Sequence, residues 1–207
     1  MDDESIKLTL EPNLGEWESA AKAVLSADEL RTVFTRSIND AIKKGKTEGL
    51  SEATAQYMPK RKELDKNVRL HLAKSGDYEP SGMLEFKGAR LPLRLFKVGP
   101  KTGVRQKGVA VSARDALSIQ IRKDGGGKTP NPLFVATMVK SSGHKDVWLR
   151  DPKGTRGPSG KEKLIIATGP SIVSMVGNDR AVERIQTAMQ ELMDKRIDHH
   201  IRQAMNK

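Results

Sequence analysis

The fold is decided by residues 178–205, NDRAVERIQTAMQELMDKRIDHHIRQAM, in the C-terminal part of the chain. Their apolar residues recur at every third or fourth position, which places them in one stripe along a helix. The stripe comprises Val182, Ile185, Met189, Leu192, Met193, Ile197, Ile201 and Met205. Charged residues such as Arg184 and Arg202 fall outside it. The pattern therefore predicts a long amphipathic helix that begins at Asn178 or Asp179 and buries one face.

A second helical region is predicted in the N-terminal part of the chain. Ser26-Ala-Asp-Glu29 has the form of a capping box, in which a hydroxyl accepts a backbone amide and a later glutamate reaches back. Apolar residues follow at helical spacing: Leu30, Val33, Phe34, Ile38, Ala41 and Ile42. We expect helical structure over residues 26–66, and again over residues 170–206, where Pro170 suits the first position of a short helix.

Residues 68–168 are predicted to form strands and loops, because apolar and polar residues alternate there in several short runs. Met83–Phe86 and Leu91–Phe96 flank the turn residues 87–90, which is typical of a β-hairpin, and Pro92 indicates an edge strand. Further strands are expected at residues 117–121, 133–139, 147–150 and 164–167. The chain is therefore predicted to be α+β, with an N-terminal helix and a long C-terminal helix packed on a mostly antiparallel sheet.

Charge is distributed unevenly along the chain. The 37 Lys and Arg residues and 26 Asp and Glu residues give a net charge of +11. Residues 1–30 carry −6, whereas residues 86–163 carry +13. This asymmetry indicates surfaces with different partners, although a solvated surface on a basic protein explains it equally well. We predict an acidic N-terminal extension at 1–25 and a single domain at 26–207.

No motif predicts catalysis, a metal site or a cofactor. The run 125–129, GGGKT, resembles a phosphate-binding loop, but Arg122 occupies the position of its first glycine and Pro130 follows where a helix should begin. His199 and His200 are adjacent, so their side chains would point about 100° apart on a helix and would not share a metal. The chain has no cysteine, and no serine lies in a nucleophile elbow. The residues therefore predict a protein that is not an enzyme and uses no cofactor.

Three motifs, in this order along the chain, resemble a known protein family. They are "LPL..F" at 91–96, "F.A.M..GH.GV..R" at 134–150, and a "GPS" element at 169–175 that leads into the final helix. The matching residues are Leu91, Pro92, Leu93, Phe96, Phe134, Ala136, Met138, Gly143, His144, Val147, Arg150, Gly169, Pro170, Ser171, Ile172 and Met175. The pattern resembles the phage minor tail protein Z family, the tail-completion proteins of long-tailed phages, over residues 27–207.

The resemblance implies a structural virion protein at the head-proximal end of the tail or at the neck, needed for head–tail joining and DNA passage. The implied partners are the tail terminator, the tail tube, the head–tail connector and further copies of the chain in a ring. The implied location is the virion, and the host cytoplasm during assembly, without membrane contact. An alternative stays open: a basic accessory protein that binds nucleic acid without sequence preference.

Two sets of residues are candidate functional positions. Gly169, Pro170 and Ser171 are predicted to form a structural turn, in which Pro170 fixes φ and Gly169 adopts a backbone angle closed to other residues. A second set of basic residues is expected to be solvent-accessible and to contact DNA or a neighbouring ring. These residues are Lys101, Arg105, Lys107, Arg114, Lys153, Arg156, Lys161 and Lys163.

Overall fold

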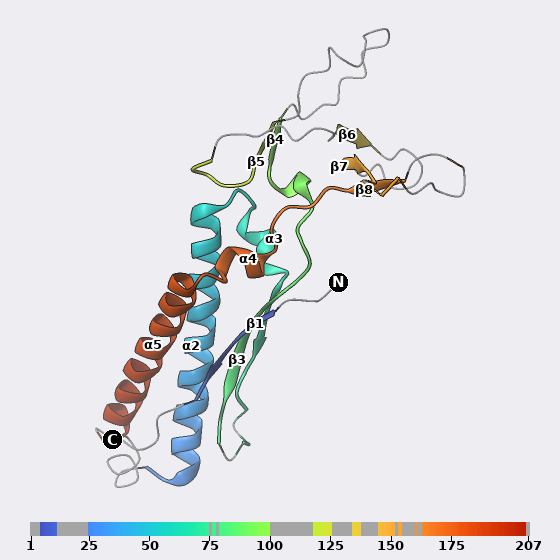
Figure 1. Ribbon diagram of the computed structural model, residues 1–207. Helices are drawn as coiled ribbons and strands as arrows, with labels where there is room; N and C mark the ends of the chain where they lie inside the picture. Colours follow the sequence, from blue (N-terminus) through green and yellow to red (C-terminus); the bar gives the residue numbers. More distant parts are fainter. Residues whose placement is uncertain are drawn as a thin grey trace. The chain divides into compact units, whose positions relative to one another are not determined.

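The computed structural model describes residues 5–11, 25–74, 76–77, 79–99, 118–125, 134–137, 145–151, 153–154, 160 and 163–205. The predicted α+β class is confirmed, since helices are combined with strands that pair antiparallel (Figure 1). The contacts group the chain into two compact units. Unit 1 consists of residues 1–53, 64–89 and 172–207, and unit 2 of residues 54–63 and 90–171. A single domain at 26–207 stays a prediction.

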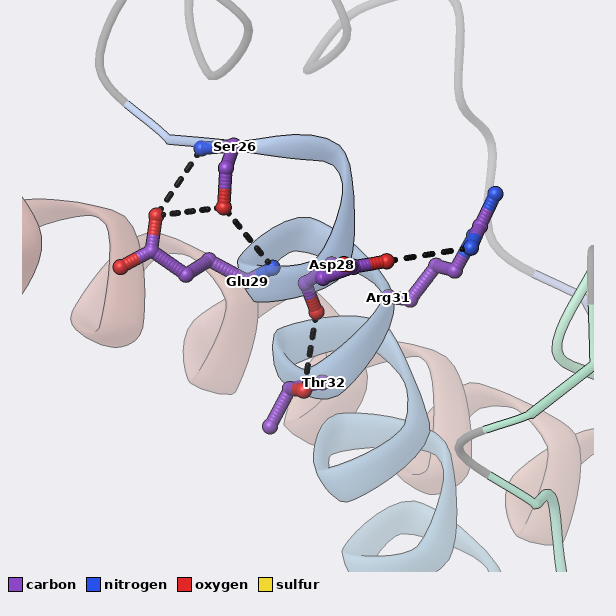
Figure 2. A network of polar contacts seen from close by, with 5 residues as sticks. All are labelled: Ser26, Asp28, Glu29, Arg31 and Thr32. Atoms are coloured by element: carbon purple, nitrogen blue, oxygen red, sulfur yellow. Dashed lines mark hydrogen bonds and ion pairs between the residues drawn. The ribbon is translucent and has the colours of Figure 1, made fainter.

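The predicted long helices form and lie side by side in unit 1 (Figure 1). Helix α2 spans Ala27–Gln56 and helix α5 spans Asp179–Met205. The capping box is confirmed: the Ser26 amide donates to the Glu29 carboxylate at 2.9 Å, and the Glu29 amide donates to the Ser26 hydroxyl at 3.4 Å (Figure 2). Helix α5 starts after Asn178, whose side-chain oxygen accepts the Ala181 amide at 2.9 Å.

Small residues form a seam along α2 at intervals of four. Its members are all buried: Ser37, Ala41, Gly45, Gly49 and Ala53. A Cβ at Gly45 would collide with the side chain of Met189 in α5, and a Cβ at Gly49 would collide with the ring of Phe86. The two glycines therefore make room for larger side chains from neighbouring elements, which outweighs their weak helix propensity. The predicted stripe of α5 is also confirmed at its buried members, Ile185, Met189, Met193, Ile197 and Ile201.

The sheet of unit 1 has the strand order β1 (Ser5–Leu10), β3 (Gly82–Lys87), β2 (Val68–His71). Strand β1 lies within the segment predicted as an acidic extension. Its residues alternate between exposed and buried, with Leu8 opposite Leu84 of β3. Leu8, Leu84 and Phe86 are buried on the face that packs in the core of unit 1.

The predicted hairpin between Met83–Phe86 and Leu91–Phe96 is wrong. Strand β3 already has partners on both sides, β1 and β2, and the amide of Lys87 donates to the Asn67 carbonyl at 2.9 Å. Leu93–Leu95 instead form a 3₁₀ helix, η1, so Leu91, Leu93 and Leu95 do not share one face of a strand. The alternating pattern of this run reflects burial of Leu91 and Leu93 beside a helical turn.

Unit 2 contains two small antiparallel sheets. In one, β4 (Lys97–Gly99) pairs with β5 (Ser118–Gln120). In the other, β7 (Lys145–Arg150) lies between β6 (Phe134–Thr137) and β8 (Leu164–Ile166). The sequence predicts strands in these regions but not their order. A short helix, α3 (Arg61–Asp65), follows α2, and α4 (Ile172–Val176) precedes α5.

Candidate functional site

Residues 167–170, which include two of the three predicted turn residues, are held by backbone hydrogen bonds to residues 91–93 at the start of η1. The amide of Gly169 donates to the Leu91 carbonyl at 2.8 Å, and the amide of Leu93 donates to the Ala167 carbonyl at 2.9 Å. Pro92 and Thr168 form an isolated antiparallel bridge between these bonds. The predicted edge strand at Pro92 is absent, but its missing amide leaves this short pairing intact.

Gly169 is required because a larger side chain would not fit. The prediction that it adopts an unusual backbone angle is wrong. Among the described residues, the glycines with positive φ are Gly88, Gly154 and Gly160, so Gly169 has a backbone angle open to any residue. A Cβ at Gly169 would lie 2.8 Å from two ring carbons of Phe96, and both residues are buried. The absent side chain therefore lets the Phe96 ring pack directly on the turn.

The rest of the turn also differs from the prediction. Helix α4 begins at Ile172, so Pro170 lies two residues before it and does not occupy its first position. Its carbonyl accepts the amide of Leu91 at 3.5 Å. Ser171, directly before the helix, is buried. Pro170 thus pairs with the Leu91 segment while the chain turns toward α4.

An ion pair that the sequence did not indicate joins η1 to β7. The guanidinium of Arg94 donates to the Asp146 carboxylate at 3.0 Å, and the Asp146 side chain is only 1% exposed. The other carboxylate oxygen accepts the amide of Val147 at 2.9 Å. A buried carboxylate needs such partners because burial removes its hydration. Arg94 and Asp146 lie 52 residues apart, so no local pattern could have paired them.

Strand β7 is joined to the turn through Val147. Its carbonyl accepts the amide of Ala167 at 2.8 Å, and Val147 is buried. Segments from all three motifs of the sequence analysis, at 91–96, 134–150 and 169–175, therefore meet in unit 2. We call this assembly, formed by residues 91–96, 146–147 and 167–171, the motif junction.

Two of the eight basic candidate residues lie in the described part of the chain. Lys153 and Lys163 are exposed, as predicted. They are brought together because the amide of Asp151 donates to the Lys163 carbonyl at 2.9 Å, and the Asp151 side chain accepts the Lys153 amide at 2.9 Å. The remaining candidates lie outside the described residues: Lys101, Arg105, Lys107, Arg114, Arg156 and Lys161.

One of the two histidines near the end of α5 lies at a groove in unit 1. His200 lines this groove, of about 340 Å³, together with Asp28, Glu29 and Arg36. Burial lowers the pKa of His200 below its usual value, and His199, Arg196 and Arg36 lower it further, against an opposing effect of Asp40. In the described ranges, no three His, Asp or Glu side chains are grouped so that they could hold a metal ion.

The described helices include none with the length and apolar character that a bilayer crossing requires. In comparisons with known proteins, no family model, no curated protein and no solved structure matches the chain.

Proposed function

We propose that the chain is a structural phage virion protein, a minor tail or tail-completion component at the head-proximal end of the tail or at the neck. In this role it is needed for head–tail joining and DNA passage, and it has no catalytic activity and no cofactor. Its partners are the tail terminator, the tail tube, the head–tail connector and further copies of the chain in a ring.

The motif junction is the observation that carries this proposal. The family resemblance rests on three motifs spread over 91–175, and independent motifs would have no reason to meet. Here the Leu91 segment bonds to Gly169 and Pro170, and Val147 of the second motif bonds to Ala167. Because the three motifs meet, we treat them as parts of one structural feature in a single fold. Members of one family are expected to share such a feature.

The charge of unit 2 supports the proposed setting. Residues 54–63 and 90–171 contain 20 Lys and Arg residues against six Asp and Glu residues, a net charge of +14, whereas unit 1 carries −3. A protein that surrounds DNA, or that sits against an acidic neighbouring ring, would use positive charge on one part of its surface.

The proposal is tested by deleting the coding sequence from the phage that encodes the chain. We expect complete heads and complete tails to accumulate separately, or joined particles to deliver no DNA. The chain supplied in trans should restore infectivity. Joined particles of normal titre from the deletion phage would overturn the proposal.

Location gives a second, independent readout. An antibody against the chain, imaged by electron microscopy on intact particles, should label the junction of head and tail. Label along the tail shaft, at its distal tip, or on no particle would contradict the proposed position.

A further inference from the structure

We infer that unit 2 carries a surface that binds the phosphodiester backbone of nucleic acid. It is formed by six basic residues beside β5, and we call it the β5 basic patch. Its members are Lys60, Arg61, Lys62, Lys97, Arg122 and Lys123. None of them belongs to the two loops whose basic residues the sequence analysis singled out.

Backbone pairing brings these residues together from three distant parts of the chain. Tyr57 lies opposite Arg122 in an isolated bridge. On either side of it, the amide of Met58 donates to the Ile121 carbonyl at 3.1 Å and the amide of Lys123 donates to the Gln56 carbonyl at 2.8 Å. The chain leading to residues 60–62 therefore runs antiparallel to the chain that leaves β5.

Strand β4 adds the third part of the patch. Lys97 lies directly opposite Gln120 in the β4–β5 pair. Gln120 is two residues before Arg122, so Lys97 is held beside the same strand by regular pairing. Arg122, Lys123 and Lys97 thus lie on or beside the stretch from Gln120 to Lys123, and Lys60, Arg61 and Lys62 follow directly after the segment 56–58 that is paired with it.

All six basic side chains are exposed. Arg122 is fixed in place: it donates to Asp124 at 3.1 Å and to Gln56 at 3.2 Å, and its guanidinium lies 5.4 Å from the centre of the Tyr57 ring. The other five have no side-chain hydrogen bond or ion pair with any described residue. A bound polyanion would neutralise cations that have no partner among the described residues.

The composition of the patch favours phosphate over an acidic protein surface. Interfaces between proteins are depleted in lysine at their centre and gather apolar and aromatic side chains there. The large exposed apolar side chains of the described residues are Leu72 and Ile166, and neither belongs to the patch. Lysine is a point charge on a long stem, suited to phosphates whose order carries no sequence information.

The inference does not depend on a place in a phage tail. Binding of nucleic acid by this patch can be measured on the isolated chain. If the patch does not bind nucleic acid, the proposed virion role still stands. If the virion role is wrong, the patch can still bind nucleic acid.

The test compares two variants with the same change in net charge. The patch variant is Lys60→Gln, Lys62→Gln, Lys97→Gln and Lys123→Gln. The control variant is Lys7→Gln, Lys74→Gln, Arg180→Gln and Lys195→Gln, four exposed cations of unit 1. Affinity for a short duplex DNA of arbitrary sequence is measured by fluorescence anisotropy over a range of salt concentrations, and circular dichroism confirms that both variants are folded.

We expect the parent to bind with a steep salt dependence and the patch variant to lose affinity at least tenfold. If each lysine neutralises one phosphate, the log–log slope becomes shallower by about 3 to 4 in the patch variant. The control variant should retain most of the parental slope. Equal slopes in the two variants would overturn the inference, because the binding would then follow net charge alone.

Two further measurements distinguish nucleic acid from an acidic protein as the partner of the patch. Polyglutamate replaces DNA as the probe: if the patch variant loses polyglutamate binding but keeps DNA binding, the surface serves an acidic protein and the inference is wrong. In the unaltered protein, bound DNA should protect Lys60, Lys97 and Lys123 from acetylation and leave Lys74 and Lys195 reactive. Equal protection at both sets would also overturn it.

Discussion

Unit 1 and unit 2 differ in net charge and, over their described residues, in how many apolar side chains they bury. Of the described residues, unit 1 buries 23 apolar side chains and unit 2 buries six. Unit 1 carries a net charge of −3, and unit 2 carries +14 over fewer residues. Unit 1 is therefore stabilised mainly by its apolar core. The described part of unit 2 buries fewer apolar side chains, so we expect single polar substitutions there to have a stronger effect.

The largest effect is expected for the Arg94–Asp146 pair. Arg94→Met removes the Arg94 guanidinium from the buried Asp146 carboxylate, and we expect unfolding of unit 2 to become easier by about 3 kcal/mol. The matched control is Arg184→Met in unit 1, which breaks an ion pair of the same 3.0 Å length to the more exposed Glu52. That control should cost less than about 1 kcal/mol. Urea unfolding measures both, and equal losses would remove the contrast between the units.

Gly169→Val tests the packing of the motif junction. The new side chain would meet the buried Phe96 ring, and overpacking of this kind costs about 2 kcal/mol. Gly125→Val in the same unit is the control, because a Cβ there meets its nearest atoms at 3.7 and 3.8 Å. Thermal unfolding of the two variants gives the comparison. A Gly169→Val variant as stable as the Gly125→Val variant would contradict the close approach of Phe96.

The seam of small residues in unit 1 predicts a difference between two similar substitutions. Gly49→Ala places a methyl group against the fully buried Phe86 ring, whereas Gly45→Ala places one against the flexible Met189 side chain. Alanine gains about 1 kcal/mol of helix propensity at either site. We expect Gly45→Ala to be nearly neutral and Gly49→Ala to lose about 1 kcal/mol net, because a ring yields less than a thioether. If urea unfolding showed a larger loss of stability for Gly45→Ala than for Gly49→Ala, the Phe86 ring of the sheet would shift more readily than the Met189 side chain of α5.

The capping box should give a smaller loss. Ser26→Ala removes the acceptor of the Glu29 amide at the start of α2 and should cost about 1 kcal/mol. Gln186→Ala, at an exposed position within α5, is the control and should be close to neutral. Amide exchange in the first turn of α2 should rise only in the Ser26 variant. Unchanged exchange there would mean that other contacts hold the first turn.

The smallest expected effect depends on pH. Burial and the neighbouring cations lower the pKa of His200 in the folded state, so the unfolded chain binds a proton more readily. Stability should therefore fall as pH drops below the unfolded value of about 6.5 and level off below the folded pKa. His200→Gln should reduce this loss, while His71→Gln serves as a control. The free energy of unfolding, measured across this range, would contradict the assignment if it fell equally in parent and His200→Gln.

The helices of unit 1 could be predicted because their signals are local. The Ser26–Glu29 capping box and the stripe from Ile185 to Ile201 each lie within one element, and both are confirmed. The seam could not be predicted, because the ring and the thioether that fill the space at Gly49 and Gly45 come from elements far away in the chain.

Strand pairing and the motif junction depend on distant residues and were predicted poorly. Proximity in sequence suggested a hairpin for residues 83–96, but β3 pairs with β1, about 80 residues earlier in the chain, and with β2. The alternating run of β1 was a usable signal, yet the acidic residues around it favoured an extension. Gly169 was singled out from the sequence, whereas the reason for a glycine there, the Phe96 ring, lies 73 residues away.

The order of segments along the chain has a consequence for folding. Unit 1 takes its elements from both sides of unit 2, since β1, α2, β2 and β3 precede residues 90–171 and α5 follows them. During synthesis, β3 can cover the seam at Gly49 early, but the side of the seam at Gly45 that faces Met189 stays uncovered until residues 90–171 and then α5 have been made. Closing so long a loop costs entropy before its contacts form, which slows folding. Unit 1 is thus the unit that a growing chain completes last.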